Sequence, residues 1–274
     1  MVRNLSIVPL SSVVLIGMLV VQLTSSRAVT GGKDKEEVVS AQDLTRAYAE
    51  NPAEFDKKYK DKVVTVEGMV SATSVKASGK SFLMIEGYTK PGDTFSHSVR
   101  CEESGPDFEG IRIGHKVRIR GTAQGHSPTL VAAELRTCKV MKVFADDYPP
   151  SKAAREEVKK LQGKWKVVSG EAEGKKLEPQ QAGFDAINFE GYTAYLHHGK
   201  QSFSFGVALD PSKTPKTIDL VGGKATLPCI YTLDGDQFRL VLPPPPAKDK
   251  GFSRADSFDT TKSKGLVLNA EREK

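Results

Sequence analysis

The 274-residue chain is poor in cysteine and in aromatic residues, and its excess of one charge sign is small. Three cysteines are too few for a disulfide-dense miniprotein or for a zinc site with four cysteine ligands. Aromatic residues make up 7% of the chain, which indicates cores built mainly from aliphatic side chains. The formal net charge of +6 comes from 40 basic and 34 acidic residues, and such a mild excess does not by itself indicate a nucleic-acid-binding protein.

Motifs of the common catalytic classes are also missing from the sequence. It contains no Gly-x-Ser-x-Gly motif, no phosphate-binding loop and no His-Glu-x-x-His motif. The adjacent His197 and His198 would point to opposite faces of a strand, which does not suit a shared metal ion. We therefore expect a protein that is not an enzyme and that holds no cofactor and no metal.

The N-terminal segment indicates export. Residues 7–23 are almost continuously apolar and follow Arg3, and Ser26-Arg27-Ala28 places small residues where a signal peptidase requires them. The strongest apolar stretch is shorter than the ~20 residues that a membrane-spanning helix needs. We predict a signal peptide over residues 1–28, a polar tether over 29–39 and an extracytoplasmic location, periplasmic or secreted. The alternative is an uncleaved anchor formed by residues 7–23, which would be the only contact with a membrane.

Residues 40–145 have the pattern of a helical start followed by short strands. Ser40 and Asn51-Pro52 are typical of helix N-termini. Period-two alternation then predicts five strands, at Val63–Val70, Ser81–Glu86, Ser96–Glu102, Lys116–Thr122 and Thr129–Val143. Gly68, inside the first strand, predicts a bend or a close approach of another segment. Five short strands over about 80 residues suit a Greek-key barrel of the OB type.

Several short motifs in this region resemble the tRNA-anti-like OB-fold family. They are Tyr59-Lys60, Lys62-Val63-Val64-Thr65-Val66-Glu67-Gly68, Val99-Arg100-Cys101, Gly114-His115-Lys116-Val117, Arg120-Gly121 and Cys138. The resemblance covers about residues 40–142. It implies an OB barrel, and the name of the family implies nucleic-acid binding.

The second half of the chain predicts another barrel. Residues 146–160 indicate a linker and a short helix, and residues 161–274 form the second domain. Eight strand-like runs are separated by explicit turns, at Lys164–Ala172, Ala186–Phe189, Thr193–His197, Gln201–Leu209, Thr217–Val221, Ala225–Leu233, Gln237–Leu242 and Gly265–Arg272. Strands that follow one another through hairpins favour an up-and-down barrel, which leaves no exposed sheet edge. The fold class is therefore mainly β, with N-terminal helices, a five-stranded OB-type barrel and an eight-stranded antiparallel barrel.

This second domain resembles a lipocalin-like domain family of unknown function from planctomycetes. The motifs that carry the resemblance are Leu161-Gln162-Gly163-Lys164-Trp165-Lys166-Val167-Val168, Gly174-Lys175, Leu209-Asp210-Pro211, Pro215-Lys216-Thr217-Ile218-Asp219 and Ile230-Tyr231-Thr232-Leu233-Asp234-Gly235-Asp236. The resemblance covers about residues 158–272 and implies a fold without implying a chemistry. Gly163-x-Trp165 also matches the Gly-x-Trp of true lipocalins, so we expect Trp165 to plug the barrel.

Two sets of residues are candidates for sites. Lys116, Arg118 and Arg120 alternate along one strand and could follow a phosphate backbone, with Phe82 and Phe95 as platforms for base stacking, although a solvated outer face explains the same pattern. Cys101 and Cys138 lie on the third and fifth strands of the OB region, which can be neighbours in a closed barrel. An oxidising compartment would then permit a Cys101–Cys138 disulfide, with Cys229 left free.

These observations leave three functions open. The sequence favours an exported, non-catalytic binding or protein-interaction protein whose partner is a protein or a small ligand rather than nucleic acid. The first alternative is an OB-fold binder of nucleic acid or oligosaccharide. The second is a carrier of a small apolar ligand in the C-terminal barrel. A barrel filled by its own side chains, including Phe203, Phe205, Phe238 and Leu240, is favoured over one with a cavity.

Overall fold

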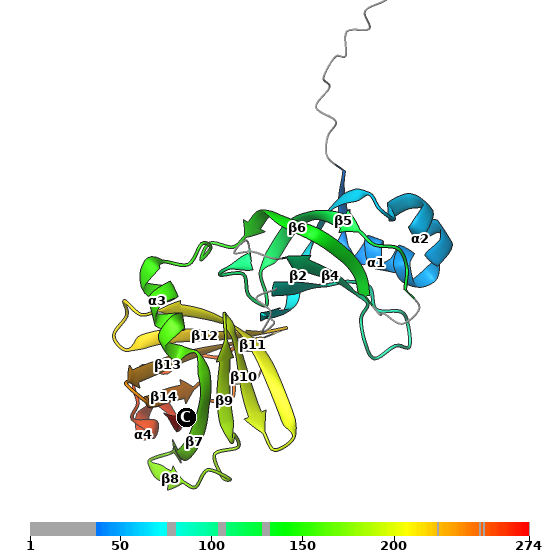
Figure 1. The fold of residues 1–274 in the computed structure, drawn as a ribbon. Coiled ribbons are helices and arrows are strands. Elements are labelled where there is room, and N and C mark those ends of the chain that lie inside the picture. The colour runs from blue at the N-terminus through cyan, green and yellow to red at the C-terminus, as the bar shows by residue number, and fades with distance from the viewer. Residues whose placement is uncertain are drawn as a thin grey trace, which may run out of the picture. The chain divides into compact units, whose positions relative to one another are not determined.

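The computed structural model describes residues 37–75, 81–103, 108–127, 132–223, 225–246, 248 and 250–273. These residues fold into two β-barrels that follow one another along the chain (Figure 1). The expected signal peptide over residues 1–28, the alternative anchor at 7–23 and most of the tether lie outside the described residues. None of the helices in the described residues is both long enough and apolar enough to cross a membrane.

The first barrel has the topology that the sequence predicts for an OB fold. It contains the helices α1 (Ala41–Glu50) and α2 (Pro52–Tyr59) and the strands β1 (Val38–Ser40), β2 (Val63–Val75), β3 (Ser81–Glu86), β4 (Ser98–Glu103), β5 (Lys116–Ala123) and β6 (Ala132–Phe144). The strand order is β1-β2-β3-β4-β6-β5, and pairing of β2 with β5 closes the barrel. Strands β4 and β6 are parallel, whereas the other pairs around the barrel are antiparallel.

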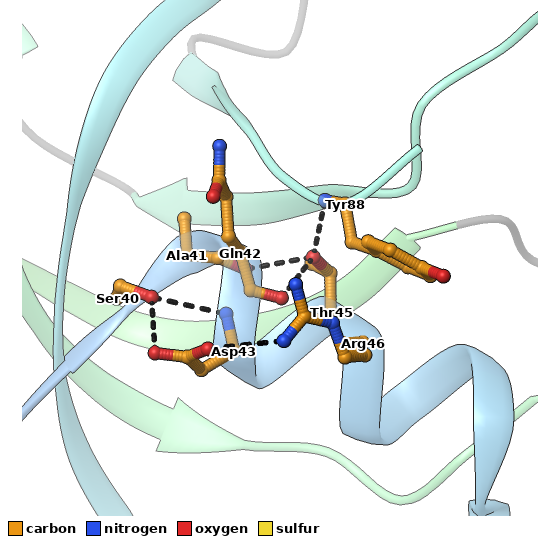
Figure 2. Close-up of polar contacts among 7 residues, drawn as sticks. All are labelled: Ser40, Ala41, Gln42, Asp43, Thr45, Arg46 and Tyr88. Carbon is orange, nitrogen blue, oxygen red and sulfur yellow. Dashed lines mark hydrogen bonds and ion pairs between the residues drawn. The ribbon is translucent and has the colours of Figure 1, made fainter. Parts of the chain in front are cut away.

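Both helices begin where the sequence predicts. The Ser40 hydroxyl accepts a hydrogen bond from the Asp43 amide at 3.0 Å and caps α1 (Figure 2). The Asn51 side chain caps α2 in the same way, and Pro52 occupies the first helical position. The apolar faces of the two helices pack in the barrel core through Leu44, Tyr48, Phe55 and Tyr59.

Buried Thr45 ties α1 to the segment that follows β3. Its hydroxyl donates to the Ala41 carbonyl at 2.7 Å and accepts from the Tyr88 amide at 2.8 Å (Figure 2). Gly87 makes this approach possible, because a Cβ there would lie 2.3 Å from the Thr45 Oγ1. Arg46, on the next position of α1, lies 4.9 Å above the Tyr88 ring. The start of α1 is therefore held at a defined place on the barrel.

Strand β1 is a difference from the sequence-based expectation, because Val38 and Val39 were predicted to belong to the tether. Val38 to Ser40 pair in parallel with Thr65 to Glu67 of β2. The first half of β2 pairs with β5 on one edge, while β3 pairs only from Val70 onward. That leaves the other edge of the first half of β2 open, and β1 satisfies its backbone groups. A three-residue strand is too short to show an alternating pattern in the sequence.

The second barrel is the predicted up-and-down barrel. It contains α3 (Lys152–Leu161), β7 (Gly163–Ala172), β8 (Lys175–Leu177), β9 (Ala186–Glu190), β10 (Thr193–His198), β11 (Gln201–Asp210), β12 (Lys216–Gly222), β13 (Ala225–Asp234), β14 (Gln237–Leu242), α4 (Thr260–Ser263) and β15 (Leu266–Arg272). The order is β15-β14-β13-β12-β11-β10-β9-β7-β8, and β15 pairs with β7 to close the barrel. The short elements β8 and α4 were not predicted. This closed topology is consistent with the resemblance to the lipocalin-like family.

Side chains from all eight barrel strands fill the interior. The buried cluster includes Trp165, Val167, Ile187, Phe189, Ala194, Leu196, Val207, Ile218, Leu220, Cys229, Tyr231, Phe238, Leu240, Leu268 and Ala270. Phe205 packs against this cluster, but Phe203 is 45% exposed, so its prediction as an interior residue is wrong. The reason is that residues 201–205 of β11 pair only with β10, and pairing with β12 starts at Gly206. Phe203 thus lies beyond the closed part of the barrel.

Trp165 is fully buried and takes part in closing the barrel. Its indole N–H donates to the Leu161 carbonyl at 2.7 Å, and the Arg272 guanidinium lies 4.1 Å from its ring. Arg272 also donates to the Lys160 and Gln162 carbonyls, each at 2.7 Å. Strands β7 and β15 and the end of α3 therefore meet where Arg272 contacts Trp165.

We predict that small apolar ligands do not bind inside this barrel, because side chains already occupy its interior. Trp165 is the only tryptophan, so its fluorescence reports on that interior alone. Fatty acids, retinoids and small aromatic compounds should neither quench the fluorescence nor raise the melting temperature. A saturable quench with a matching thermal shift would show instead that the barrel is a ligand carrier.

Candidate functional site

The outer surface of the OB barrel carries a row of cations on β5. Lys116, Arg118 and Arg120 point outward, and they alternate with Val117 and Ile119, which are fully buried in the core. This alternation follows directly from the period of two along a strand. The three cations therefore lie on one face of β5, as predicted. Two residues of a strand span about 6.8 Å, which sets the distance from one cation to the next.

Strand β6 places a second row of cations beside the first. The pairing sets Lys142 opposite Arg118, Lys139 opposite Arg120, and Arg136 opposite Thr122. Residues that are paired across two strands project from the same face of the sheet. We call these six residues the basic face: Lys116, Arg118, Arg120, Arg136, Lys139 and Lys142. Two of its cross-strand pairs bring like charges directly opposite each other, an arrangement that destabilises a sheet.

Sequence reasoning missed the β6 half of the basic face. The pairing of β5 with β6 shifts register twice, between Arg118 and Ile119 and between Arg120 and Thr122. These irregularities put residues 136, 139 and 142 on one face, although simple alternation would place residue 139 on the opposite face from residues 136 and 142. Thr137, at the second irregularity, has a φ of 54°. In the sequence, Arg136, Lys139 and Lys142 are three residues apart. This spacing places them on one face of a strand only if the strand contains bulges, which the sequence does not reveal.

Phe144 lies at the end of the basic face, opposite Lys116 in the ladder. Its ring centroid is 4.6 Å from Lys142 Nζ, 5.2 Å from Lys116 Nζ and 5.5 Å from the Arg118 guanidinium carbon. A ring attracts cations through its negative faces, so Phe144 offsets part of the repulsion among them. The ring therefore gathers three positive groups at one place on the surface.

Glu67, on the outward side of β2, neutralises one part of the basic face. Its carboxylate accepts from Lys116 Nζ at 2.5 Å and from Arg118 at 2.7 and 3.1 Å. The hydrogen bond from Lys116, followed by that from Arg118, lowers the pKa of the Glu67 carboxyl below its ordinary value. Glu67 thus stays ionised and holds the two cations in fixed positions.

We predict that Glu67→Gln lowers stability at neutral pH by about 1 kcal/mol, because it removes charge-assisted bonds to two cations. Since folding lowers the pKa of Glu67, these bonds contribute above the pKa of the unfolded chain and are lost as pH falls through the folded value. Urea unfolding at pH 7 and pH 3 measures the effect, and the difference from wild type should shrink at pH 3. Glu178→Gln, at an exposed position, is the control. An equal difference at both pH values would contradict this account.

The predicted stacking residues lie elsewhere on the OB barrel. Phe82, on β3, is covered by the Arg100 guanidinium at 5.0 Å, and Arg100 pairs with Glu102 at 2.6 Å and Glu134 at 3.9 Å. Phe95, between β3 and β4, is 80% exposed. The structure does not bring these rings together with the β5 cations. The reason is that β3 pairs with the second half of β2 and β5 pairs with its first half.

Cys101 and Cys138 lie close together in the barrel core and carry free thiols in the structure. Cys101 pairs with Leu135 across β4 and β6, and the Cys138 thiol donates to the carbonyl of the same Leu135 at 3.3 Å. A hydrogen bond with Cys138, together with burial, raises the pKa of Cys101. Burial also raises the pKa of Cys229 in the second barrel. The structure thus shows two neighbouring thiols where the sequence predicted a disulfide.

We predict that these two thiols form a disulfide in protein recovered from an oxidising compartment, because the fold already places them side by side. Thiol counting under denaturing, non-reducing conditions should then find one thiol, that of Cys229. Chain-entropy arguments allow a gain of about 3–4 kcal/mol for the closed loop. A count of three thiols would refute the bridge, and a Cys138→Ser variant, with two unpaired cysteines left, should give a count of two.

Among the described residues, no group of three or more His, Cys, Asp or Glu side chains is arranged to hold a metal ion. Besides the basic face, the OB barrel carries a cleft that is lined in part by Lys116 and Arg118.

The match to a protein-family model agrees with the OB topology. The model of the tRNA_anti-like family matches residues 3–139, half of the 274-residue chain. No curated protein matches the sequence. A solved structure described as an aspartyl-tRNA synthetase from Leishmania major Friedlin is similar at 16% identity and a TM-score of 0.26, over 42% of this chain and 22% of that one. The chain thus spans about a fifth of the length of that protein. The OB topology and the match over half of the sequence show that the chain belongs to the tRNA_anti-like family.

Proposed function

We propose that this protein is a non-catalytic binding protein whose OB barrel binds an extended polyanion, single-stranded nucleic acid, on the basic face. The observation that carries the proposal is the pairing of like charges across β5 and β6, Arg118 with Lys142 and Arg120 with Lys139. The tRNA_anti-like OB barrel is a fold of the nucleic-acid-binding type, which supports the same assignment.

The energetics of the basic face favour an anionic ligand. Like charges directly opposite in a ladder cost stability in the unbound protein. A bound phosphate chain would remove that cost and would release counterions from the nucleic acid, which favours binding. The two rows run along neighbouring strands, so they present a linear array of charges rather than a single pocket. A linear array suits a polymer better than a small anion.

The sequence alone favours a protein or a small ligand as the partner, whereas the strand pairing favours nucleic acid. In the sequence, the three cations of β5 are compatible with an ordinary solvated face, and the net charge is low. The strand pairing adds three more cations to the same face, and this concentration supports a polyanion as the ligand. Export remains a separate proposal that rests on residues 1–28, and an exported protein with this face would bind nucleic acid outside the cytoplasm.

We predict that the variant Arg136→Glu/Lys139→Glu/Lys142→Glu binds oligo(dT) at least about 10-fold more weakly than wild type. Fluorescence anisotropy at several salt concentrations between about 50 and 200 mM measures this. The variant loses three contacts to phosphates, so the slope of log affinity against log salt should fall in magnitude by about 2. Thermal unfolding of each variant verifies that the fold is kept.

The matched control is Lys166→Glu/Lys175→Glu/Lys176→Glu, at exposed positions of β7 and β8 in the second barrel. It changes the net charge by the same amount and should leave both affinity and slope near the wild-type values. Equal weakening in the two variants would show that only net charge matters and would refute a specific face. Binding to an acidic polysaccharide such as heparin without binding to oligo(dT) would refute nucleic acid as the ligand.

A further inference from the structure

A cleft of about 460 Å³ adjoins the basic face on the OB barrel. It lies between β1, the start of α1 and the outer sides of β2, β3 and β5. We call it the edge cleft, and the lining residues that matter here are Val38, Gln42, Met69, Glu86, Lys116 and Arg118. Its volume falls in the range of small-ligand sites. Lys116 and Arg118 belong to both the basic face and the edge cleft, so the two features are continuous.

Two apolar side chains that line the edge cleft are exposed to solvent. Val38 is 37% exposed and Met69 is 42% exposed. Gly68, which precedes Met69 in β2 and also lines the cleft, has no room for a side chain, because a Cβ would lie 2.5 Å from Ile85 Cγ2 and 2.9 Å from Ala41 Cβ. This close packing holds β2 against the start of α1. An unbranched thioether such as Met69 adapts well to the flat face of a ring.

The polar groups of the edge cleft differ in whether they already have partners. Glu67 is engaged by Lys116 and Arg118. Within the part of the chain that the structure describes, no hydrogen bond or ion pair engages the side chains of Glu86 and Gln42. Figure 2 shows the Gln42 side chain extending away from the polar contacts of Ser40, Asp43 and Thr45. The edge cleft therefore offers one carboxylate acceptor and one amide that can both donate and accept.

We propose that the edge cleft binds one base of the bound strand and selects a base that carries an exocyclic amino group; this rests on the proposed function. The Glu86 carboxylate would accept a hydrogen bond from the amino group of adenine, cytosine or guanine, and Gln42 would complete the recognition. Met69 and Val38 would contact the face of the base. The adjoining phosphates would lie on the basic face, beyond the carboxylate of Glu67.

The charge of the edge cleft favours a base over the other small occupants. A free anion such as inorganic phosphate would meet the carboxylates of both Glu67 and Glu86, which repel it. A purely apolar molecule would leave the polar groups of Glu86 and Gln42 desolvated and unpaired. A base has an apolar face and a polar edge, and in a bound strand it comes attached to the phosphate that the cations require.

The test compares the affinities of oligo(dA), oligo(dC) and oligo(dT) of about 12 nucleotides for the full chain. We expect wild type to bind oligo(dA) and oligo(dC) at least about fivefold more tightly than oligo(dT), because thymine has no amino group. Glu86→Ala should abolish this preference. The matched control Glu156→Ala, an exposed position on α3, removes the same charge and should keep the preference.

Met69 gives a second readout that does not depend on base preference. Among the five methionines, only the methyl carbon signal of Met69 should shift strongly when adenosine monophosphate is added to protein with labelled methionine methyl groups. Met69→Ala should weaken binding of all three oligonucleotides by about five- to tenfold and leave the salt slope unchanged.

The possible results separate this inference from the proposed function. Equal, salt-dependent binding of all three oligonucleotides would overturn base selection in the edge cleft and leave polyanion binding intact. A preference for oligo(dA) and oligo(dC) that persists in Glu86→Ala would also overturn it, because the preference would then come from stacking alone. Absence of salt-dependent binding to any oligonucleotide would overturn both proposals.

Discussion

The OB barrel depends on the division of one long strand, β2, between two partners. Residues Val63 to Met69 pair with β5, and pairing with β3 begins at Val70. The division closes the barrel and leaves an open edge for β1, which in turn positions the start of α1. It also separates Phe82 from the cations of β5. The basic face and the edge cleft therefore lie where they do because of the pairing of this strand.

The same strand pairing determines the electrostatics of the OB barrel. Two like-charged pairs across β5 and β6 cost stability, and two groups offset part of that cost. Glu67 neutralises Lys116 and Arg118 from one side, and Phe144 attracts three cations to its ring at the other. The compensation is incomplete toward Arg136 and Lys139, since Glu67 and Phe144 lie at the opposite end of the two rows. That end of the basic face is the part most available to an added anion.

The second barrel follows a different physical principle, in which burial rather than surface charge dominates. Its interior is filled by side chains from the eight strands of the closed barrel, and the contact between Arg272 and Trp165 joins the two strands that close it. An interior occupied in this way leaves the outer surface and the loops as the parts that can interact with other molecules. The proposed binding site accordingly lies on the OB barrel.

The sequence alone determined the local features of both domains. Ser40 and Asn51-Pro52 predict the helix starts, alternation predicts the strands that form both barrels, and Gly68 predicts a close approach, because each of these signals lies within a few residues. The cations at 116, 118 and 120 were found for the same reason. The tertiary structure decided that Arg136, Lys139 and Lys142 share their face, that Phe203 lies outside the closed barrel, and that β1 is a strand. Each of these outcomes depends on a bulge or on a partner strand far away in the chain, and neither has a local signature in the amino-acid sequence.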